Sequence, residues 1–250
     1  MKAIILAGGL GTRAKPFTDY CPKPMIPIDD RPTIDYIVRY LSKFSEIDEI
    51  IIICNLDKEG HGNQIKNYFD GKESLLNKKI TYVEDKFEGT GGALLRAREF
   101  LKNENEFLVW FSDNLCAIDL DSMTEFHRNR KGIGCMAIAK KKREETGFVK
   151  LDGNGLILEF REKPIVELED PECLAIYIFN KKILDYISRE RERKASVNLS
   201  FDVLQKLPAN EKLFGFDIGN ANWIDIESPI KVERSIDLIK KIIGQMKVIQ

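Results

Sequence analysis

The chain has 250 residues and a formal net charge of −1, and 32% of its residues are charged. This balance gives no sign of a basic surface for nucleic acid, and no apolar run is long enough to cross a membrane. The five cysteines are scattered without a C-x-x-C pair, and there are only two histidines, so neither a disulfide framework nor a zinc site is favoured. We therefore expect a cytoplasmic protein whose partners are neither nucleic acids nor membranes.

The first half alternates between short apolar runs and helical patterns. Strands are expected at 2–7, 49–54, 79–84, 107–111 and 134–139, and helices shortly after Pro32 and at 62–70, 92–102 and 119–130. Strands separated by helices need crossover connections, which produce parallel pairing. The pattern predicts a Rossmann-like α/β fold, with a mostly parallel sheet and helices on both faces.

The second half begins with a hairpin signal. Residues 147–160 are typical of two strands around Asp152-Gly153-Asn154-Gly155. Further strands are expected at 173–179 and 213–218, and a closing helix at 229–246. We predict one α/β domain over 1–250 that carries a small antiparallel flap.

A glycine-rich turn follows the first predicted strand. Gly9-x-Gly11-x-x-Ala14 fits the dinucleotide fingerprint, but a Rossmann loop must lead directly into a helix whose N-terminus binds the pyrophosphate. Here prolines follow at 16, 22, 24 and 27, and no helix can run through them. An NAD-dependent oxidoreductase is therefore disfavoured.

The same turn favours a different phosphate site. Bare glycine backbone, followed by Arg13 and Lys23 on an extended loop, can bind phosphates without a helix dipole. The simpler alternative is a tight turn with surface cations.

Further motifs make the sequence resemble the sugar-1-phosphate nucleotidyltransferases, also called nucleotide-sugar pyrophosphorylases. The motifs occur in the family order over nearly the whole chain: LAGGLGTRAKPFT with PKPMIPI, EGTGGAL (88–94), FSDNL (111–115), TGFVKLD (146–152), FREKP (160–164), LAIYIFN (174–180), SFDVL (200–204) and WIDI (223–226). Among members of this family, the motifs are most similar to those of enzymes that use GTP with mannose-1-phosphate or heptose-1-phosphate.

The resemblance implies that a sugar-1-phosphate attacks the α-phosphate of a nucleoside triphosphate and releases pyrophosphate. Residues 1–140 would bind the nucleotide, 141–228 the sugar, and 229–250 would close the domain. The implied catalytic residues are Arg13, Lys23 and Lys163, and Asp113 and Asp225 would hold Mg²⁺. The implied nucleotide-binding residues are Leu6, Ala7, Gly8, Gly9, Gly11, Thr12, Glu84, Gly89 and Thr90. The implied sugar-binding residues are Gly147, Glu162, Ala175 and Tyr177.

Glu84 favours guanine as the base, because a carboxylate matches the adjacent N1–H and N2–H donors of guanine. Thymidylyl or uridylyl transfer to glucose-1-phosphate stays open. The sequence also departs from the family pattern at Ser112, Ala175 and Glu227. These changes leave a second class open, a non-catalytic regulatory subunit that senses a nucleotide sugar. The sequence does not decide whether the chain forms a homo-oligomer.

Overall fold

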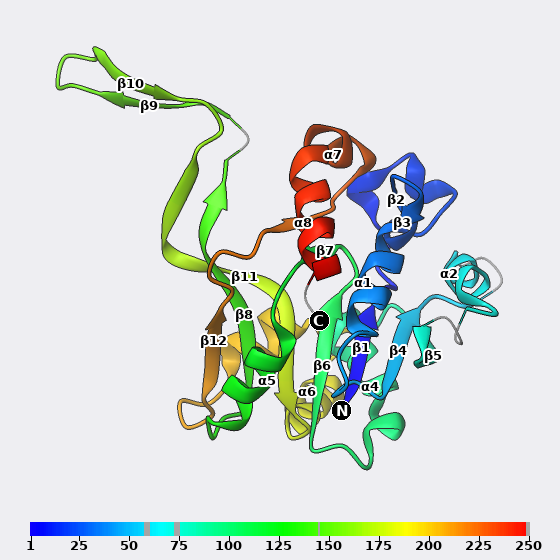
Figure 1. Cartoon of the computed structure of the whole chain (residues 1–250). Coiled ribbons are helices and arrows are strands. Elements are labelled where there is room, and N and C mark those ends of the chain that lie inside the picture. Colours follow the sequence, from blue (N-terminus) through cyan, green and yellow to red (C-terminus); the bar gives the residue numbers. More distant parts are fainter. Residues whose placement is uncertain (58–60, 73–75, 145, 249–250) are drawn as a thin grey trace.

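The computed structural model describes residues 1–57, 61–72, 76–144 and 146–248, so the end of the predicted closing segment lies outside it. Its centre is a seven-stranded sheet of order β12-β8-β11-β6-β1-β4-β5 (Figure 1). The strands are β1 (Lys2–Leu6), β4 (Glu49–Cys54), β5 (Lys79–Glu84), β6 (Glu106–Phe111), β8 (Gly134–Arg143), β11 (Ile165–Asn180) and β12 (Leu213–Asp217). All neighbours pair in parallel except β11, which runs antiparallel to β6 and to β8.

Helices cover both faces of this sheet. The helices α1 (Thr33–Leu41), α2 (Gly62–Phe69), α5 (Leu120–Arg128) and α8 (Ile236–Val248) pack on one core cluster, and α4 (Gly89–Arg96) and α6 (Ile183–Arg193) pack on the other. Strand β4 supplies both clusters, since Ile50 and Ile52 point to one face and Ile51 and Ile53 to the other. The predicted fold class is confirmed.

The proline-containing loop after β1 contains no α-helix. It holds three single turns of 3₁₀-helix, η1 (Thr12–Ala14), η2 (Phe17–Asp19) and η3 (Lys23–Met25), and a ribbon of β2 (Pro27–Ile28) and β3 (Arg31–Pro32). These one-turn helices tolerate prolines near their first residues, and α-helix begins only at Thr33. No α-helix directly follows the glycine turn, as the prolines predicted, and a dinucleotide-binding loop would need one.

Several predicted elements differ in extent. The predicted strand 173–179 is the inner part of the long β11, and residues 92–102 form the end of α4 and a separate turn, η4 (Arg98–Leu101). The closing helix is two helices, α7 (Pro229–Arg234) and α8, because Ser235 leaves the helical conformation. The short pair β7 (Asn114–Cys116) and β13 (Trp223–Asp225) was not predicted as a ribbon. The remaining turns are η5 (Leu199–Val203) and η6 (Leu204–Lys206).

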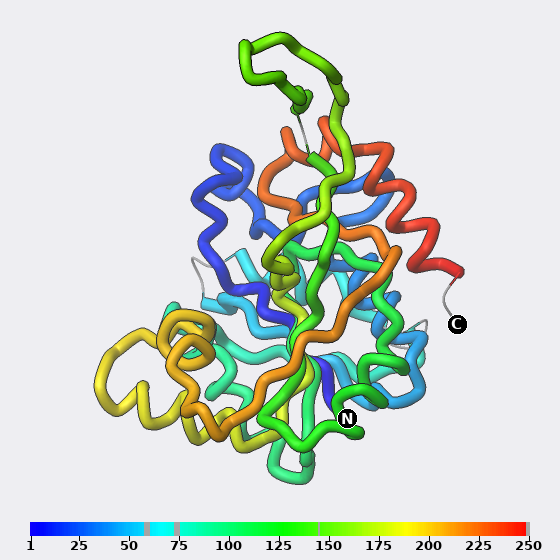
Figure 2. Tube along the Cα trace, turned by 90° about the vertical axis from the view of Figure 1, so that its left-hand side faces the viewer, coloured from blue at the N-terminus to red at the C-terminus, as the bar shows by residue number. Residues whose placement is uncertain are grey.

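The predicted hairpin forms β9 (Phe148–Leu151) and β10 (Ile157–Arg161). It projects from the outer ends of β8 and β11 and stands clear of the body in both views (Figure 1, Figure 2). We call residues 147–163 the arm. Among the residues described above, no helix is both long and apolar enough to cross a membrane.

One buried carboxylate joins three neighbouring strands at their amino ends. Glu49 opens β4, and its side chain lies 2.8 Å from Lys2 Nζ of β1 and 2.8 Å from Lys79 Nζ of β5. Burial raises the pKa of Glu49, but hydrogen bonds from Lys2, Lys79 and Thr81 outweigh it and lower the pKa from 4.5 to about 2. The ionised carboxylate therefore stabilises the fold.

We predict that Glu49→Gln lowers the free energy of unfolding by about 2 kcal/mol at pH 7. The contribution is complete above the unfolded-state pKa of 4.5 and is lost as the pH falls toward about 2, because the folded pKa is the lower one. Urea unfolding at pH 7 and pH 3 measures this, with Glu99→Gln, at an exposed pair with Lys102, as the control. A difference between wild type and Glu49→Gln that is the same at both pH values would contradict the prediction.

Candidate functional site

The candidate site lies where β1 and β6 end. These strands are parallel neighbours, with Leu6 opposite Phe111, so the segments that follow them emerge at the same edge of the sheet. The backbone N–H of Ser112 donates to the carbonyl of Leu6 at 3.1 Å. This bond places the glycine turn after β1 beside Asp113.

Lys23 brings two carboxylates together at this edge. Its Nζ lies 2.7 Å from Asp113 Oδ2 and 3.9 Å from Asp225 Oδ1. Asp225 arrives on β13, opposite Asn114 of β7, and the N–H of Ile226 donates to the carbonyl of Asp113 at 2.7 Å. The small β7–β13 ribbon thus fixes Asp225 beside Asp113, although the two residues are far apart in sequence.

The environment of Asp225 disfavours its charge. Burial and the neighbouring carboxylate of Asp113 raise the pKa of Asp225 to about 6, although Lys23 opposes the shift. Asp225 Oδ1 is also buried with no hydrogen-bond partner within the described structure. A buried acceptor of this kind is costly unless water or a cation satisfies it, so the geometry suits a bound cation.

The described residues include no group of three or more His, Cys, Asp or Glu side chains that could hold a metal ion. Two carboxylates alone are an incomplete shell for a metal, except where the remaining ligands are waters or substrate phosphates. That arrangement is typical of Mg²⁺.

Arg13 lies on η1, and its exposed guanidinium forms an ion pair with Glu227, just beyond β13. The sequence singled out Glu227 only as a departure from the family pattern. The structure instead gives it a cationic partner from the glycine-turn loop. A second exposed pair, Lys15 with Asp19 at 2.9 Å, lies on the same loop.

The glycine turn is shaped by close contacts. Gly11 has φ +60°, and its carbonyl accepts a hydrogen bond from Thr18 Oγ1 at 2.9 Å. A Cβ on Gly8 would lie 1.9 Å from Asp85 Oδ2, so only glycine fits there. Asp85 follows β5 and was not identified from the sequence. Gly9 and Thr12 are exposed.

Backbone groups of two predicted nucleotide contacts already have partners. The N–H of Ala7 donates to Ile53 O at 2.8 Å, and the carbonyl of Leu6 accepts from Ser112. The N–H of Ala7 is therefore not free to donate to a base.

Gly89 and Thr90 have partners within the protein. Gly89 has φ +80°, and a Cβ there would lie 2.4 Å from the carbonyl oxygen of Val197. Thr90 Oγ1 accepts from the N–H of Leu199 at 2.8 Å. Both residues therefore hold the segment before η5 against α4, a role that explains them without a ligand.

Glu84 ends β5 and is half-buried. Its Oε2 accepts a hydrogen bond from the backbone N–H of Leu56 at 3.0 Å, which fixes the carboxylate at the carboxyl end of the sheet. One of its two oxygens is thus committed to the protein.

The predicted sugar-binding residues are divided between two places. Ile176 of β11 pairs with Trp110, so Ala175, at φ +51°, lies level with Phe111 near Asp113. Tyr177 is buried and stacks on Phe179, with ring centroids 5.1 Å apart.

Gly147, Glu162 and Lys163 lie at the base of the arm and are exposed. No hydrogen bond or ion pair of the described structure joins any of the three to Lys23 or Asp113.

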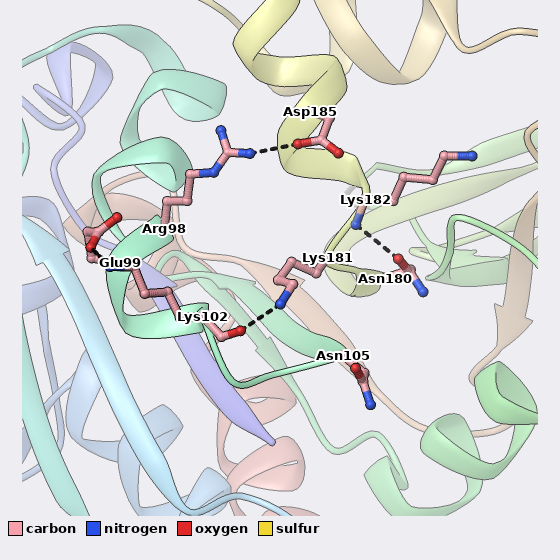
Figure 3. A pocket seen from close by; sticks show the side chains of 8 residues that line it. All are labelled: Arg98, Glu99, Lys102, Asn105, Asn180, Lys181, Lys182 and Asp185. Carbon is pink, nitrogen blue, oxygen red and sulfur yellow. Dashed lines mark hydrogen bonds and ion pairs between the residues drawn. The ribbon is translucent and has the colours of Figure 1, made fainter.

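A surface hollow at the opposite edge of the sheet is unrelated to this site (Figure 3). It is lined by Arg98, Glu99, Lys102, Asn105, Asn180, Lys181, Lys182 and Asp185. Asn105 precedes β6, whereas Asp113 follows it. Arg98 pairs there with Asp185 at 2.6 Å, and Lys102 pairs with Glu99. Lys181 Nζ donates to the backbone carbonyl of Lys102 at 2.7 Å, and Lys182 pairs with Glu211 outside the lining.

Comparisons with known proteins agree with the motif pattern. A family model described as nucleotidyl transferase matches residues 2–230. The mannose-1-phosphate guanylyltransferase catalytic subunit beta of Dictyostelium discoideum is 29% identical over 92% of this chain and 62% of its own length. The D-glycero-alpha-D-manno-heptose 1-phosphate guanylyltransferase of Aneurinibacillus thermoaerophilus is 33% identical over 92% of this chain and 94% of its own length.

Relatives whose names give a different nucleotide substrate also match. A UTP–glucose-1-phosphate uridylyltransferase of Synechocystis is 33% identical over 90% of this chain and 60% of its own length. This chain spans roughly half to two thirds of the length of the first curated relatives it matches.

Solved structures share the fold. A putative glucose-1-phosphate thymidylyltransferase of Bacillus anthracis, in complex with a sucrose, has a TM-score of 0.66 at 26% identity, covering 95% of this chain and 94% of its own. HddC of Yersinia pseudotuberculosis, complexed with GMP-PN, has a TM-score of 0.68 at 24% identity, covering 96% of this chain and 98% of its own.

Proposed function

Because this chain belongs to the nucleotidyl transferase family, we propose that it joins a nucleoside triphosphate to a sugar-1-phosphate and releases pyrophosphate. The observation that carries the proposal is the position of Lys23 between Asp113 and Asp225, at the edge where β1 and β6 end. A cation and two hard oxygen donors beside a bare glycine turn are suited to phosphate chemistry.

The reaction needs charge neutralisation more than proton transfer. A phosphate monoester has a second pKa of about 6, so the attacking oxygen of the sugar phosphate is already an anion at neutral pH. The barrier lies in bringing this anion to the α-phosphate of a second polyanion. Lys23 supplies a point charge near the reacting phosphates, and Arg13 supplies a fork that can grip paired phosphate oxygens.

Asp113 and Asp225 would hold Mg²⁺, which favours carboxylate and phosphate oxygens. The buried Oδ1 of Asp225, which has no hydrogen-bond partner, is an oxygen that such an ion would satisfy. The bound ion would neutralise charge on the reacting phosphates. Lys23 engages Asp113 Oδ2 and so keeps the carboxylate pair in place without substrate.

Guanine is the base that we propose. Glu84 is fixed by Leu56, and its second oxygen remains to accept from a base. A carboxylate matches the paired N–H donors of guanine, while the single N–H of uracil or thymine between two carbonyls suits an amide better. Relatives named as guanylyltransferases for mannose-1-phosphate and for a manno-heptose 1-phosphate support GTP with mannose-1-phosphate or a related sugar.

A matrix of four nucleoside triphosphates against several sugar-1-phosphates, with Mg²⁺ and pyrophosphate release as the readout, tests the function. We expect the highest kcat/KM with GTP and mannose-1-phosphate or a manno-heptose 1-phosphate. Turnover only with UTP or dTTP and glucose-1-phosphate would contradict the choice of base. Tight binding of nucleotide sugar without turnover for any pair would indicate a non-catalytic sensor instead.

We predict that Lys23→Ala and Asp113→Asn each lower kcat by about 10²–10³, the range for losing one group that stabilises charge in a transition state. Lys15→Ala is the matched control, because Lys15 lies on the same loop but pairs with Asp19 away from the carboxylates. Far-ultraviolet circular dichroism checks that each variant is folded. Wild-type turnover in folded Asp113→Asn would refute the metal role of Asp113.

Glu227 competes with the triphosphate for Arg13. An exposed ion pair contributes about 0.2–1 kcal/mol, so releasing Arg13 by Glu227→Gln should lower the KM for the nucleotide up to about fivefold. Initial rates over a range of nucleotide concentrations measure this, with Asp19→Asn as the control for loss of an exposed carboxylate. An unchanged or higher KM in Glu227→Gln would show that the pair does not restrain Arg13.

A further inference from the structure

The arm carries an apolar face that stays exposed within the described structure. Cross-strand pairing puts Leu151 opposite Ile157 and Val149 opposite Phe160 on one side of the ribbon. These four side chains are between 47% and 63% exposed. An isolated two-stranded ribbon is only marginally stable in water, and a contiguous exposed apolar face marks an interaction site.

The other face of the arm is suited to solvent. It carries Lys150 opposite Glu159 and Phe148 opposite Arg161, and Arg161 lies 3.9 Å from Glu159. The ribbon is therefore amphipathic, with one face built for burial and one for water. Eight of the fifteen exposed large apolar side chains of the described structure lie within residues 148–165.

The stem below the arm holds it away from its own body. The β8–β11 ladder continues outward to the pair Ile165–Arg143, and the N–H of Glu144 donates to the carbonyl of Pro164 at 2.9 Å. An ion pair between Lys142 of β8 and Glu172 of β11, at 3.0 Å, also joins these two strands. Folding the arm onto the Lys23, Asp113 and Asp225 site of its own chain would disturb this ladder, whereas contact with a second chain would not.

Lys163 and Glu162, at the base of the arm, make no hydrogen bond or ion pair with Lys23 or Asp113 within the described structure. The proposed function already uses Lys23 at the reacting phosphates and Arg13 on paired phosphate oxygens. The phosphate on the sugar therefore needs a further cation. The site of one chain is thus incomplete.

Segments beside the site of Lys23, Asp113 and Asp225 carry exposed apolar side chains that are available to cover the arm. Leu10 lies within the glycine turn, and Phe87 donates its N–H to Asp85, the carboxylate that packs on Gly8. Ile230 follows the Glu227 that pairs with Arg13. All three side chains are exposed.

We propose that the arm docks beside the Lys23, Asp113 and Asp225 site of a second copy of this chain, so that Lys163 and Glu162 of each chain complete the site of the other. The inference rests on the proposed function, and on the roles that the family resemblance implies for Lys163 as a catalytic residue and Glu162 as a sugar-binding residue. A reciprocal exchange closes as a two-fold dimer and buries both apolar faces at once.

Complementation between two inactive variants separates this arrangement from a site completed within one chain. Lys23→Ala damages the body, and Lys163→Ala damages the arm. Each homodimer should lose at least about a hundredfold in turnover. A heterodimer isolated through two different affinity tags should recover about half of the wild-type rate, because one of its two sites then combines an intact body with an intact arm.

An inactive heterodimer would overturn the inference, because each chain would then need its own arm. Wild-type turnover in Lys163→Ala would also overturn it, since the arm would supply no required residue. Asp113→Asn in place of Lys23→Ala repeats the test if the first body variant is unfolded.

A second measurement does not depend on activity. In a freely exchanged equal mixture of chains with ordinary and heavy nitrogen, a photoreactive amino acid at Phe160 should cross-link to the segments around Leu10, Phe87 or Ile230. About half of the cross-linked pairs should join a light with a heavy chain, as random pairing in a dimer gives. Cross-links only within one chain, or a wild type that light scattering finds monomeric, would overturn the inference. If no substrate pair is turned over but these intermolecular cross-links form, the proposed function fails while the docking stands.

Substitutions on the two faces of the arm provide matched variants. Val149→Ser with Phe160→Ser should convert the dimer to a monomer, because the apolar face is lost. Lys150→Ser with Glu159→Ser, on the solvated face of the same ribbon, should leave the dimer intact. A dimer that persists in the Val149→Ser, Phe160→Ser variant but dissociates in the Lys150→Ser, Glu159→Ser variant would contradict the assignment of the apolar face as the interface.

Discussion

Asp113, which follows β6, and Asp225, which ends β13, both lie beside Lys23, and their negative charges repel. Two unit charges about 4 Å apart near a protein surface interact by roughly 4 kcal/mol, enough to push one carboxyl toward its neutral form. The raised pKa of Asp225, caused first by burial and then by Asp113, reflects this strain. Lys23, 2.7 Å from Asp113, is the cation that lets the two carboxylates remain neighbours. The rest of the site is arranged around this triad.

Strand pairing brings Lys23, Asp113 and Asp225 together. Parallel pairing of β1 with β6 sets the lysine loop beside Asp113, and the β7–β13 ribbon returns Asp225 from the far end of the chain. Prolines keep the loop from becoming a helix, so Lys23 approaches on a short 3₁₀ turn. The cost is a site that is electrostatically strained without ligand, as expected where a cation and phosphates are to be bound.

Local patterns predicted the sheet, the helix-free loop and the hairpin, because hydrophobic periodicity and turn residues encode them directly. The family motifs likewise identified Lys23, Asp113 and Asp225 as candidates. Contacts between distant segments left no such signal: the pair of Arg13 with Glu227, and Asp85 beneath Gly8, depend on how loops meet. The direction of the arm was equally unpredictable, since the alternation that defines a hairpin does not say which body its apolar face will meet.

Binding of Mn²⁺ as a substitute for Mg²⁺, followed by electron paramagnetic resonance with a non-reactive nucleoside triphosphate, tests the triad most directly. The account predicts that Asp113→Asn and Asp225→Asn each weaken binding of the ion by at least about tenfold, because each removes one of only two protein carboxylates that would hold it. Glu99→Gln, a carboxylate change at an exposed pair with Lys102, should leave the affinity for the ion unchanged. Equal Mn²⁺ affinity in wild type and in both aspartate variants would contradict the claim that these carboxylates form a cation site.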